Sequence, residues 1–275
     1  MLILALESSA KPASVAVCSD GELLGQYYQN NGLTHSRTLL AMAKSLLTNL
    51  DITISDIGLV AVSRGPGSFT GVRIGVAAAK GLAWGLNIPV CGVSTLESMA
   101  YQTPEQGVLL CPVMDARRNQ VYNAVFQWRD GILVRLCDDR AISLADLVTE
   151  LRTSFSRSIP SAPSAPSTQS TPLTPSASPV PCAPSALSTL ISPNASDIFS
   201  ASNVAPSQIL LIGDGAAISF DYLLNNDIPC KIAPNLMRWQ TAYGVALAAC
   251  HADPIPAIEL EPSYLRPSQA ERERF

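Results

Sequence analysis

Apolar residues recur at every second position along some segments of this chain and at every third or fourth position along others, and the two patterns alternate. In the first hundred residues, strand spacing covers residues 2–7, 13–19, 22–29, 59–63 and 89–93. Helical spacing covers residues 34–50 and 70–86. Asp20-Gly21 is a typical turn of a β-hairpin. This order predicts an α/β fold in which mixed sheets are covered by helices.

A second block of the same kind begins near residue 107. Its strand patterns cover residues 108–114, 121–128, 132–137 and 208–212. Its helical patterns cover residues 143–152, 216–225 and 240–250. Ser143 is expected to cap the first of these helices. We therefore expect two lobes, an N-terminal one over residues 1–103 and a C-terminal one over residues 104–275.

Ser, Pro, Ala and Thr dominate the chain from about residue 155 to 206, where charged residues are almost absent. Such a segment buries too little apolar area to offset the entropy lost on ordering. We expect a disordered insertion that interrupts the second lobe. Deletion of residues from about 156 to 205 should cost little stability, because loop closure depends only weakly on loop length.

Charge and hydropathy exclude several classes of protein. The net charge of −4 provides no chain-wide basic field to attract nucleic acid. The N-terminal apolar run lacks a basic region and ends at Glu7, unlike a signal peptide. The most apolar helical stretch, residues 71–86, contains Arg73 and Lys80 and is shorter than the roughly 20 residues that span a bilayer. Seven scattered cysteines without a CxxC pair indicate buried thiols in a reducing cytoplasm.

The sequence Gly-Pro-Gly-Ser-Phe-Thr-Gly at residues 65–71 lies between a predicted strand and a predicted helix. Its glycines permit positive φ angles and close backbone approach, and Ser68 or Thr70 can cap the helix. Amides of the first helical turn, beside an arginine, would attract an anion. The candidate contacts for an anion or nucleotide are Gly65, Gly67, Ser68, Thr70 and Arg73. A tight turn followed by a helix cap explains the same residues without a ligand.

Known nucleotide motifs do not match this loop. A Walker A loop needs Lys followed by Ser or Thr after its glycines, and no such pair is present. The dinucleotide pattern fails because Thr70 stands where the third glycine belongs. The following strand, residues 89–93, also ends without the acidic residue that binds the ribose.

A serine hydrolase is a further alternative. Ser63 stands one residue away from the G-x-S-x-G pattern, and a predicted strand precedes it. Pro66 and Gly67 separate it from the following helix, however, whereas a nucleophile elbow leads directly into one. His251 would have to act as the base, and no acid is placed in the usual order before it.

Metal chemistry has little support. The residue four positions after His35 is Leu39, so a helix-borne pair of metal-binding histidines is missing. Asp115 and Asp214 each follow a predicted strand, where many α/β proteins bind ligands, but turn chemistry explains both. We therefore expect no metal and no cofactor.

Several segments also carry a common resemblance. They are residues 2–9, 13–17, 35–36, 64–75, 77–82, 92–97, 112–117, 121–122 and 262–266. The most specific is Arg-Gly-Pro-Gly-Ser-Phe-Thr-Gly-Val-Arg-Ile-Gly at residues 64–75. Together they resemble the TsaB (YeaZ) family over about residues 1–152 and 207–266. Glu7 stands where this family usually has an aspartate.

The resemblance implies an actin-like fold of two ribonuclease-H-like lobes. It implies a cytoplasmic, non-catalytic dimerisation subunit that forms a heterodimer with TsaD, works with TsaE and reaches tRNA through the complex. There TsaD transfers a threonylcarbamoyl group, supplied by TsaC as an adenylate, to N6 of adenosine 37 in tRNAs that read codons beginning with A. A homodimer is the alternative assembly of the isolated chain. The alternative function is an ATP-dependent phosphotransferase of the actin-like superfamily, with Glu7 or Asp115 organising magnesium.

The predicted helix over residues 70–86 is apolar around most of its circumference, which predicts burial on more than one side. One stripe of this helix contains Gly71, Gly75, Ala78, Leu82 and Gly85. A second, bulkier stripe contains Val72, Val76, Ala79, Ala83 and Leu86 and suits the sheet. We predict that the first stripe joins His35 and the helix over residues 34–50 in a four-helix interface with TsaD. Burial of this stripe by the first helix within one chain is the alternative.

Overall fold

The structure of the chain is a computed structural model that describes residues 1–157 and 208–266. The insertion predicted at about 155–206, and the effect of deleting it, fall almost entirely outside the described residues. Within those residues, no helix combines the length and apolar character needed to cross a membrane.

The first of two sheets has the strand order β3-β2-β1-β4-β5. Its strands are β1 (Leu2–Glu7), β2 (Ala13–Ser19), β3 (Glu22–Gln29), β4 (Leu59–Gly65) and β5 (Val90–Ser94). The first three pair antiparallel, whereas β4 and β5 pair parallel to β1 and to each other. Each strand begins within one residue of its predicted position.

The second sheet has the order β10-β9-β6-β7-β8. Its strands are β6 (Leu109–Asp115), β7 (Gln120–Arg129), β8 (Ile132–Ser143), β9 (Ile209–Ile212) and β10 (Cys230–Ile232). Three antiparallel strands are again followed by two parallel ones, so the second sheet repeats the first. The strand β8 continues beyond its predicted end because it stays paired with β7 as far as Gln120. The strand β10 was not predicted, since three residues are too few to show a period.

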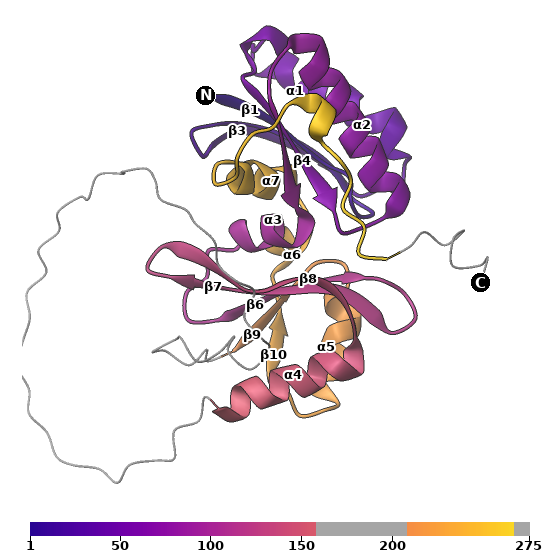
Figure 1. Cartoon of the computed structure of the whole chain (residues 1–275), viewed down its shortest axis with the longest axis vertical. Coiled ribbons are helices and arrows are strands. Elements are labelled where there is room, and N and C mark those ends of the chain that lie inside the picture. Colours follow the sequence, from indigo (N-terminus) through magenta and orange to yellow (C-terminus); the bar gives the residue numbers. More distant parts are fainter. Residues whose placement is uncertain (158–207, 267–275) are drawn as a thin grey trace, which may run out of the picture.

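Helices cover both faces of each sheet. In the first lobe, α1 (His35–Asn49) and α2 (Phe69–Leu86) cover the face that contains Leu4 and Leu6. The opposite face, with Ile3 and Ala5, packs against α7 (Ala242–Ala249). The expectation that residues 104–275 form the second lobe is therefore wrong for α7. Its small apolar residues pack on the first sheet, to which the chain returns at its C-terminal end (Figure 1).

The second sheet is covered in the same way. On one face lie α4 (Leu144–Arg157) and α5 (Ala216–Leu224), and α3 (Thr95–Tyr101) lies on the other. Ser143 caps α4 as predicted, since its Oγ accepts a hydrogen bond from the backbone N of Asp146 at 3.1 Å. The helix α3 was not predicted. It packs against α7, and the two form the layer between the sheets (Figure 1).

The chain crosses between the lobes after α3 and again between the short helix α6 (Asn235–Arg238) and α7. The side chain of Gln102 joins these crossings. Its Nε2 donates to the carbonyl oxygens of Met237, at 2.9 Å, and Trp239, at 2.7 Å. Its Oε1 accepts from Oγ1 of Thr241 at 2.7 Å. One partly buried amide thus fixes the second crossing relative to the first.

We expect Gln102→Ala to lower the free energy of unfolding by about 1–3 kcal/mol, because three partners lose their hydrogen bonds. Urea denaturation measures this difference. Gln106→Ala is the matched control: Gln106 is exposed, and the change should stay within about 0.5 kcal/mol. Equal effects of the two substitutions would contradict the role assigned to Gln102.

Candidate functional site

Glu7 ends β1 and is fully buried. Its Oε1 accepts hydrogen bonds from the backbone N and the Oγ of Ser9, each at 2.6 Å, and its Oε2 accepts one from Oγ of Ser63. Burial raises the pKa of the Glu7 carboxyl above its usual value, whereas the hydrogen bonds from Ser63 and Ser9 and the proximity of His35 act in the opposite direction. Both carboxyl oxygens are therefore engaged within the first lobe.

The glycine-rich loop packs against the turn between β1 and β2. The backbone N of Ser68 donates to the carbonyl oxygen of Ser9 at 2.6 Å. A Cβ atom on Gly67 or Gly71 would lie less than 3.0 Å from the carbonyl oxygens of Ser9 and Ser8, respectively. These glycines thus permit close approach between two parts of one lobe. Ser68 also caps α2, as predicted, because its Oγ accepts from the backbone N of Gly71 at 3.4 Å.

Two other predicted anion contacts, Arg73 and Gly65, lie against Tyr264 and Ser263, respectively. The guanidinium of Arg73 lies 3.7 Å from the ring centroid of Phe69, and its Nε donates to the hydroxyl of Tyr264 at 2.7 Å. The carbonyl oxygen of Ser263 lies so close to Gly65 that a Cβ atom there would be less than 3.0 Å away. Ser263 and Tyr264 belong to a segment that carries the family resemblance, but no local sequence pattern indicates these contacts. Ligand binding by the loop stays a prediction.

His35 begins α1 and contacts its own lobe. Its Nε2 lies 2.8 Å from the carbonyl oxygen of Ala10. Its Nδ1 is buried and has no hydrogen-bond partner in the described part of the chain. The ring thus ties the start of α1 to the turn after β1, and its place in an interface with another protein stays a prediction.

The glycine stripe of α2 was predicted to be free to contact another protein, but most of it is covered within the lobe. Gly71 and Gly75 are buried, and a Cβ atom at either position would lie less than 3.0 Å from an atom of Ser8. Ala78 and Leu82 are partly buried against the core that α1 also joins, and only Gly85 of this stripe is exposed. The physical reason is that α1 and the turn after β1 already cover this side of the helix. The second stripe packs on the sheet as predicted, with Val72, Val76, Ala79 and Ala83 buried.

The exposed side of α2 is instead the one that carries its charges. Trp84 is 83% exposed, and Ala77, Gly81 and Gly85 beside it are also exposed. We call these four residues the outer strip of α2. Leu40 on the neighbouring α1 is 47% exposed. An exposed tryptophan among small residues is a typical feature of a protein-binding surface.

In the second lobe, one acidic residue, Asp115, ends β6, and another, Asp214, lies two residues after the neighbouring β9. Asp115 is exposed, and its Oδ1 accepts a hydrogen bond from the backbone N of Arg117 at 2.7 Å. Asp214 accepts one from Nε2 of Gln240 at 2.9 Å, and burial raises the pKa of the Asp214 carboxyl. Gly213 has a φ of +109°, in agreement with the predicted turn. Arg117 to Asn119 form a run of three positive φ angles that the sequence did not indicate.

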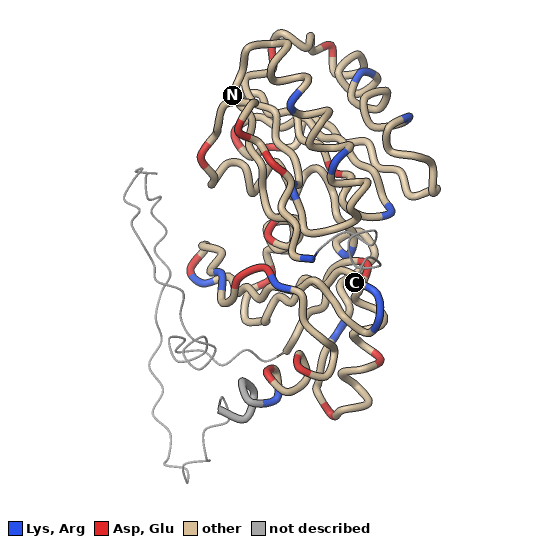
Figure 2. The backbone as a smooth tube through the Cα atoms, turned by 45° about the vertical axis from the view of Figure 1, so that its right-hand side comes forward, with Lys and Arg blue, Asp and Glu red and all other residues tan. Residues whose placement is uncertain are grey.

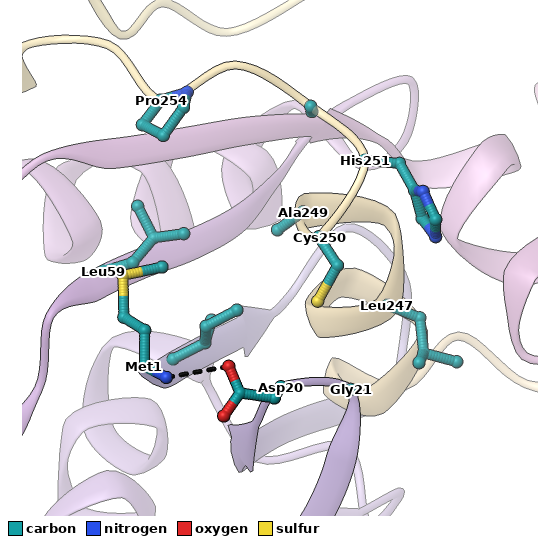
Figure 3. Close-up of a pocket in the computed structure, with 11 residues that line it drawn as sticks. Met1, Asp20, Gly21, Leu59, Leu247, Ala249, Cys250, His251 and Pro254 are labelled. Atoms are coloured by element: carbon teal, nitrogen blue, oxygen red, sulfur yellow. Dashed lines mark hydrogen bonds and ion pairs between the residues drawn. The ribbon is translucent and has the colours of Figure 1, made fainter. Parts of the chain in front are cut away.

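A cavity of about 570 Å³ lies at the other end of the first sheet (Figure 3). Its lining includes Met1, Asp20, Leu59 and Cys250, and the Met1 amino group pairs with Asp20 at 2.9 Å. Burial raises the pKa of the Cys250 thiol, which disfavours the reactive thiolate. The raised pKa therefore does not favour Cys250 as a nucleophile, although this residue is exposed.

The structure does not bring Ser63 and His251 together. Ser63 lies near the end of β4 and bonds to Glu7, whereas His251 lines the cavity beside the start of β4. The imidazole of His251 stacks on the ring of Tyr101, with centroids 5.0 Å apart. The hydrolase alternative is therefore not supported.

Charged and metal-binding residues add no further candidate. Lys and Arg are interspersed with Asp and Glu along both lobes (Figure 2). Over residues 1–157 and 208–266, no group of three or more His, Cys, Asp or Glu side chains is placed to hold a metal ion.

Two lobes with one repeated strand order, joined through a central helical layer, define an actin-like protein of two ribonuclease-H-like lobes. The chain superposes on YeaZ from Pseudomonas aeruginosa with a TM-score of 0.64, covering 96% of this chain and 99% of that one at 21% identity. This similarity confirms the predicted fold.

Sequence comparison identifies the family. The family model described as "TsaD: tRNA N6-adenosine threonylcarbamoyltransferase" matches residues 30–170, just over half of the chain. A Bacillus subtilis relative named "tRNA threonylcarbamoyladenosine biosynthesis protein TsaB" is 37% identical over 152 residues, which are 55% of this chain and 66% of the relative. The Escherichia coli relative of the same name is 38% identical over 129 residues, 46% of this chain and 55% of the relative. These matches span less than two thirds of each relative's length. The chain belongs to the family that this model defines and, within it, to the TsaB (YeaZ) proteins.

Proposed function

We propose that this chain acts in the cytoplasm as a non-catalytic subunit for the biosynthesis of threonylcarbamoyladenosine in tRNA. In this proposal it forms a heterodimer with TsaD and supports the transfer of the threonylcarbamoyl group to N6 of adenosine 37 in tRNAs that read codons beginning with A. TsaC supplies the group as an adenylate, TsaE joins the complex, and tRNA is reached through the complex. The family membership and the names of the relatives support this assignment.

The environment of Glu7 is the observation that favours an accessory role. A phosphotransferase of the actin-like superfamily needs an acidic residue at this position to organise magnesium between the lobes. Here both oxygens of the Glu7 carboxyl accept hydrogen bonds from Ser9 and Ser63 inside the lobe, and burial favours the neutral form. Asp115 is exposed, but the Glu7 carboxyl would not be available to bind magnesium together with it. The phosphotransferase alternative is therefore disfavoured.

We place the contact with TsaD on the outer strip of α2 and the adjacent α1. In Figure 1 these two helices lie together on the outer side of the first sheet, away from the second lobe. The strip offers a large exposed aromatic ring at Trp84, and its small residues would let another helix approach closely. This site replaces the glycine stripe, whose residues Gly71 and Gly75 are already buried within the lobe.

Trp84→Glu is expected to reduce the yield of TsaD that co-purifies with this chain on the order of tenfold or more, because a charge would replace the aromatic anchor. Co-expression with tagged TsaD and quantification of the recovered complex measure the effect. Since Trp84 is almost fully exposed, the melting temperature of the isolated variant should match that of the wild type.

Leu236→Glu is the matched control. Leu236 is 94% exposed on α6, away from the outer strip, so this variant should bind TsaD like the wild type. A folded Trp84→Glu variant that recovers TsaD at full yield would exclude the strip as the interface. Failure of the wild-type chain to bind TsaD, together with a shift to a homodimer, would contradict the proposed function itself.

A further inference from the structure

Residues 255–266 form a segment that leaves the first sheet and runs beside α2 towards the second lobe (Figure 1). The segment begins with two backbone hydrogen bonds between Ile255 and Val90, at 2.8 and 2.9 Å. Leu260 is buried in the core of the first lobe. The ammonium group of Lys80 donates to the carbonyl oxygens of Ile258 and Leu260, each at 3.0 Å. This half of the segment is firmly attached to the first lobe.

The next residues pass over the glycine-rich loop. The backbone N of Ser263 donates to the carbonyl oxygen of Arg64 at 2.6 Å. The ring of Tyr264 lies against Phe69, with centroids 4.9 Å apart, and its hydroxyl accepts from Arg73. Phe69, Arg73 and Lys80 are spaced so that they share one side of α2. The segment therefore follows this side of the helix, next to the outer strip.

The segment reaches the second lobe at Arg266. Its Nη1 donates to the carbonyl oxygen of Ala116 at 2.7 Å. Ala116 lies in the turn between β6 and β7, where Arg117, Arg118 and Asn119 have positive φ angles. Thus several backbone, side-chain and core contacts hold the segment to the first lobe, while a side-chain hydrogen bond holds it to the second.

The lobes are also joined by the packing of α3 against α7, by a hydrogen bond of 2.5 Å from Oγ of Ser94 to Oδ2 of Asp139, and at the two covalent crossings. There Gln102 connects both crossings, and Nε1 of Trp128 donates to the carbonyl oxygen of Thr103 at 3.0 Å. Trp128 lies near the end of β7, whereas the turn that Arg266 contacts precedes the start of this ten-residue strand. At about 3.3 Å per residue, the contact of Trp128 with Thr103 and the contact of Arg266 with Ala116 lie roughly 25–30 Å apart.

We propose that residues 255–266 form a releasable clasp that holds the two lobes closed. Two-lobed proteins open by rotation about the segments that connect them. Such a rotation separates Arg64 in the first lobe from Ala116 in the second, and the clasp ties these two residues together through Ser263 and Arg266. Its weak end is at Arg266, so opening breaks that hydrogen bond first and then loosens Ser263 and Tyr264 from the glycine-rich loop.

Hydrogen exchange followed by mass spectrometry tests this proposal on the full chain. Arg266→Ala should accelerate exchange on the order of tenfold in two segments on opposite lobes, residues 64–69 and 115–120, because removal of a hydrogen bond from an ionised donor increases the open population. Tyr264→Ala releases the clasp from α2 and should give the same pattern. If Arg266→Ala fails to fold, Tyr264→Ala is the variant that tests the proposal.

The control is Arg37→Ala, which removes a positive charge from an exposed position on α1 and should leave both segments unchanged. Faster exchange in residues 115–120 alone would mean that Arg266 stabilises only the turn between β6 and β7. This result would contradict the proposal that the segment holds the lobes closed. Unchanged exchange in both segments of a folded variant would overturn it as well.

Discussion

Gly71→Ala is expected to lower the free energy of unfolding by about 3 kcal/mol or more, although alanine is the better helix former. The added Cβ atom would lie less than 3.0 Å from the carbonyl oxygen of Ser8, a backbone atom that no side-chain rotation can move. Relief requires a shift of α2 or of the turn after β1. Either shift also disturbs the hydrogen bond that Ser8 Oγ donates to the carbonyl oxygen of Gly71, at 2.9 Å. Urea denaturation followed by circular dichroism measures the loss.

Gly81→Ala in the same helix is the control. Gly81 is exposed, and no atom lies within 4 Å of the Cβ position there. This substitution should stabilise the chain by up to about 1 kcal/mol, because alanine loses less backbone entropy in a helix. If both substitutions stabilise the protein, the turn after β1 does not pack on α2 as described.

Glu7→Ala is expected to lower the free energy of unfolding by about 2–5 kcal/mol. The substitution leaves a cavity and removes the acceptor for the backbone N and hydroxyl of Ser9 and for the hydroxyl of Ser63. Glu7→Gln should cost far less, because the amide keeps an oxygen acceptor towards Ser9 and the hydroxyl of Ser63 can accept from the new NH₂ group.

The difference in stability between the wild type and Glu7→Gln should depend on pH, and its sign follows from the burial of Glu7. The pKa of the Glu7 carboxyl is raised above its ordinary value of 4.5 in the folded state. The folded state therefore binds this proton more tightly than the unfolded state. The resulting stability is complete below pH 4.5 and is lost as the pH rises through the folded-state pKa. Glu7→Gln has no such loss, so its stability relative to the wild type should increase with pH across this range.

Urea midpoints of the wild type and Glu7→Gln, measured from about pH 4 to pH 8, test this expectation. Parallel curves would show that the Glu7 carboxyl is not held in the environment described. An ATPase turnover of the wild type that Glu7→Gln abolishes would instead favour the phosphotransferase alternative.

The sequence alone determines most of the local structure. The strands of the first sheet and the helices α1 and α2 begin within one residue of their predicted positions, because alternation and helical spacing report which sides of a segment are buried. The caps Ser68 and Ser143 were also predictable, since capping involves neighbours only three residues away. Residues 64–75 are specific enough to indicate the family by their order alone.

The tertiary structure decided what covers each buried side. Helical spacing showed that α2 is buried on two sides, but it did not show that Ser8, 63 residues before Gly71, covers the glycine stripe. The return of α7 to the first sheet and the contact between Arg266 and Ala116, 150 residues apart, have no local signal either. The physical reason is that periodicity records burial, which depends on the segment itself. The contacts that place Glu7, the outer strip and the clasp depend on which distant segments the fold brings together.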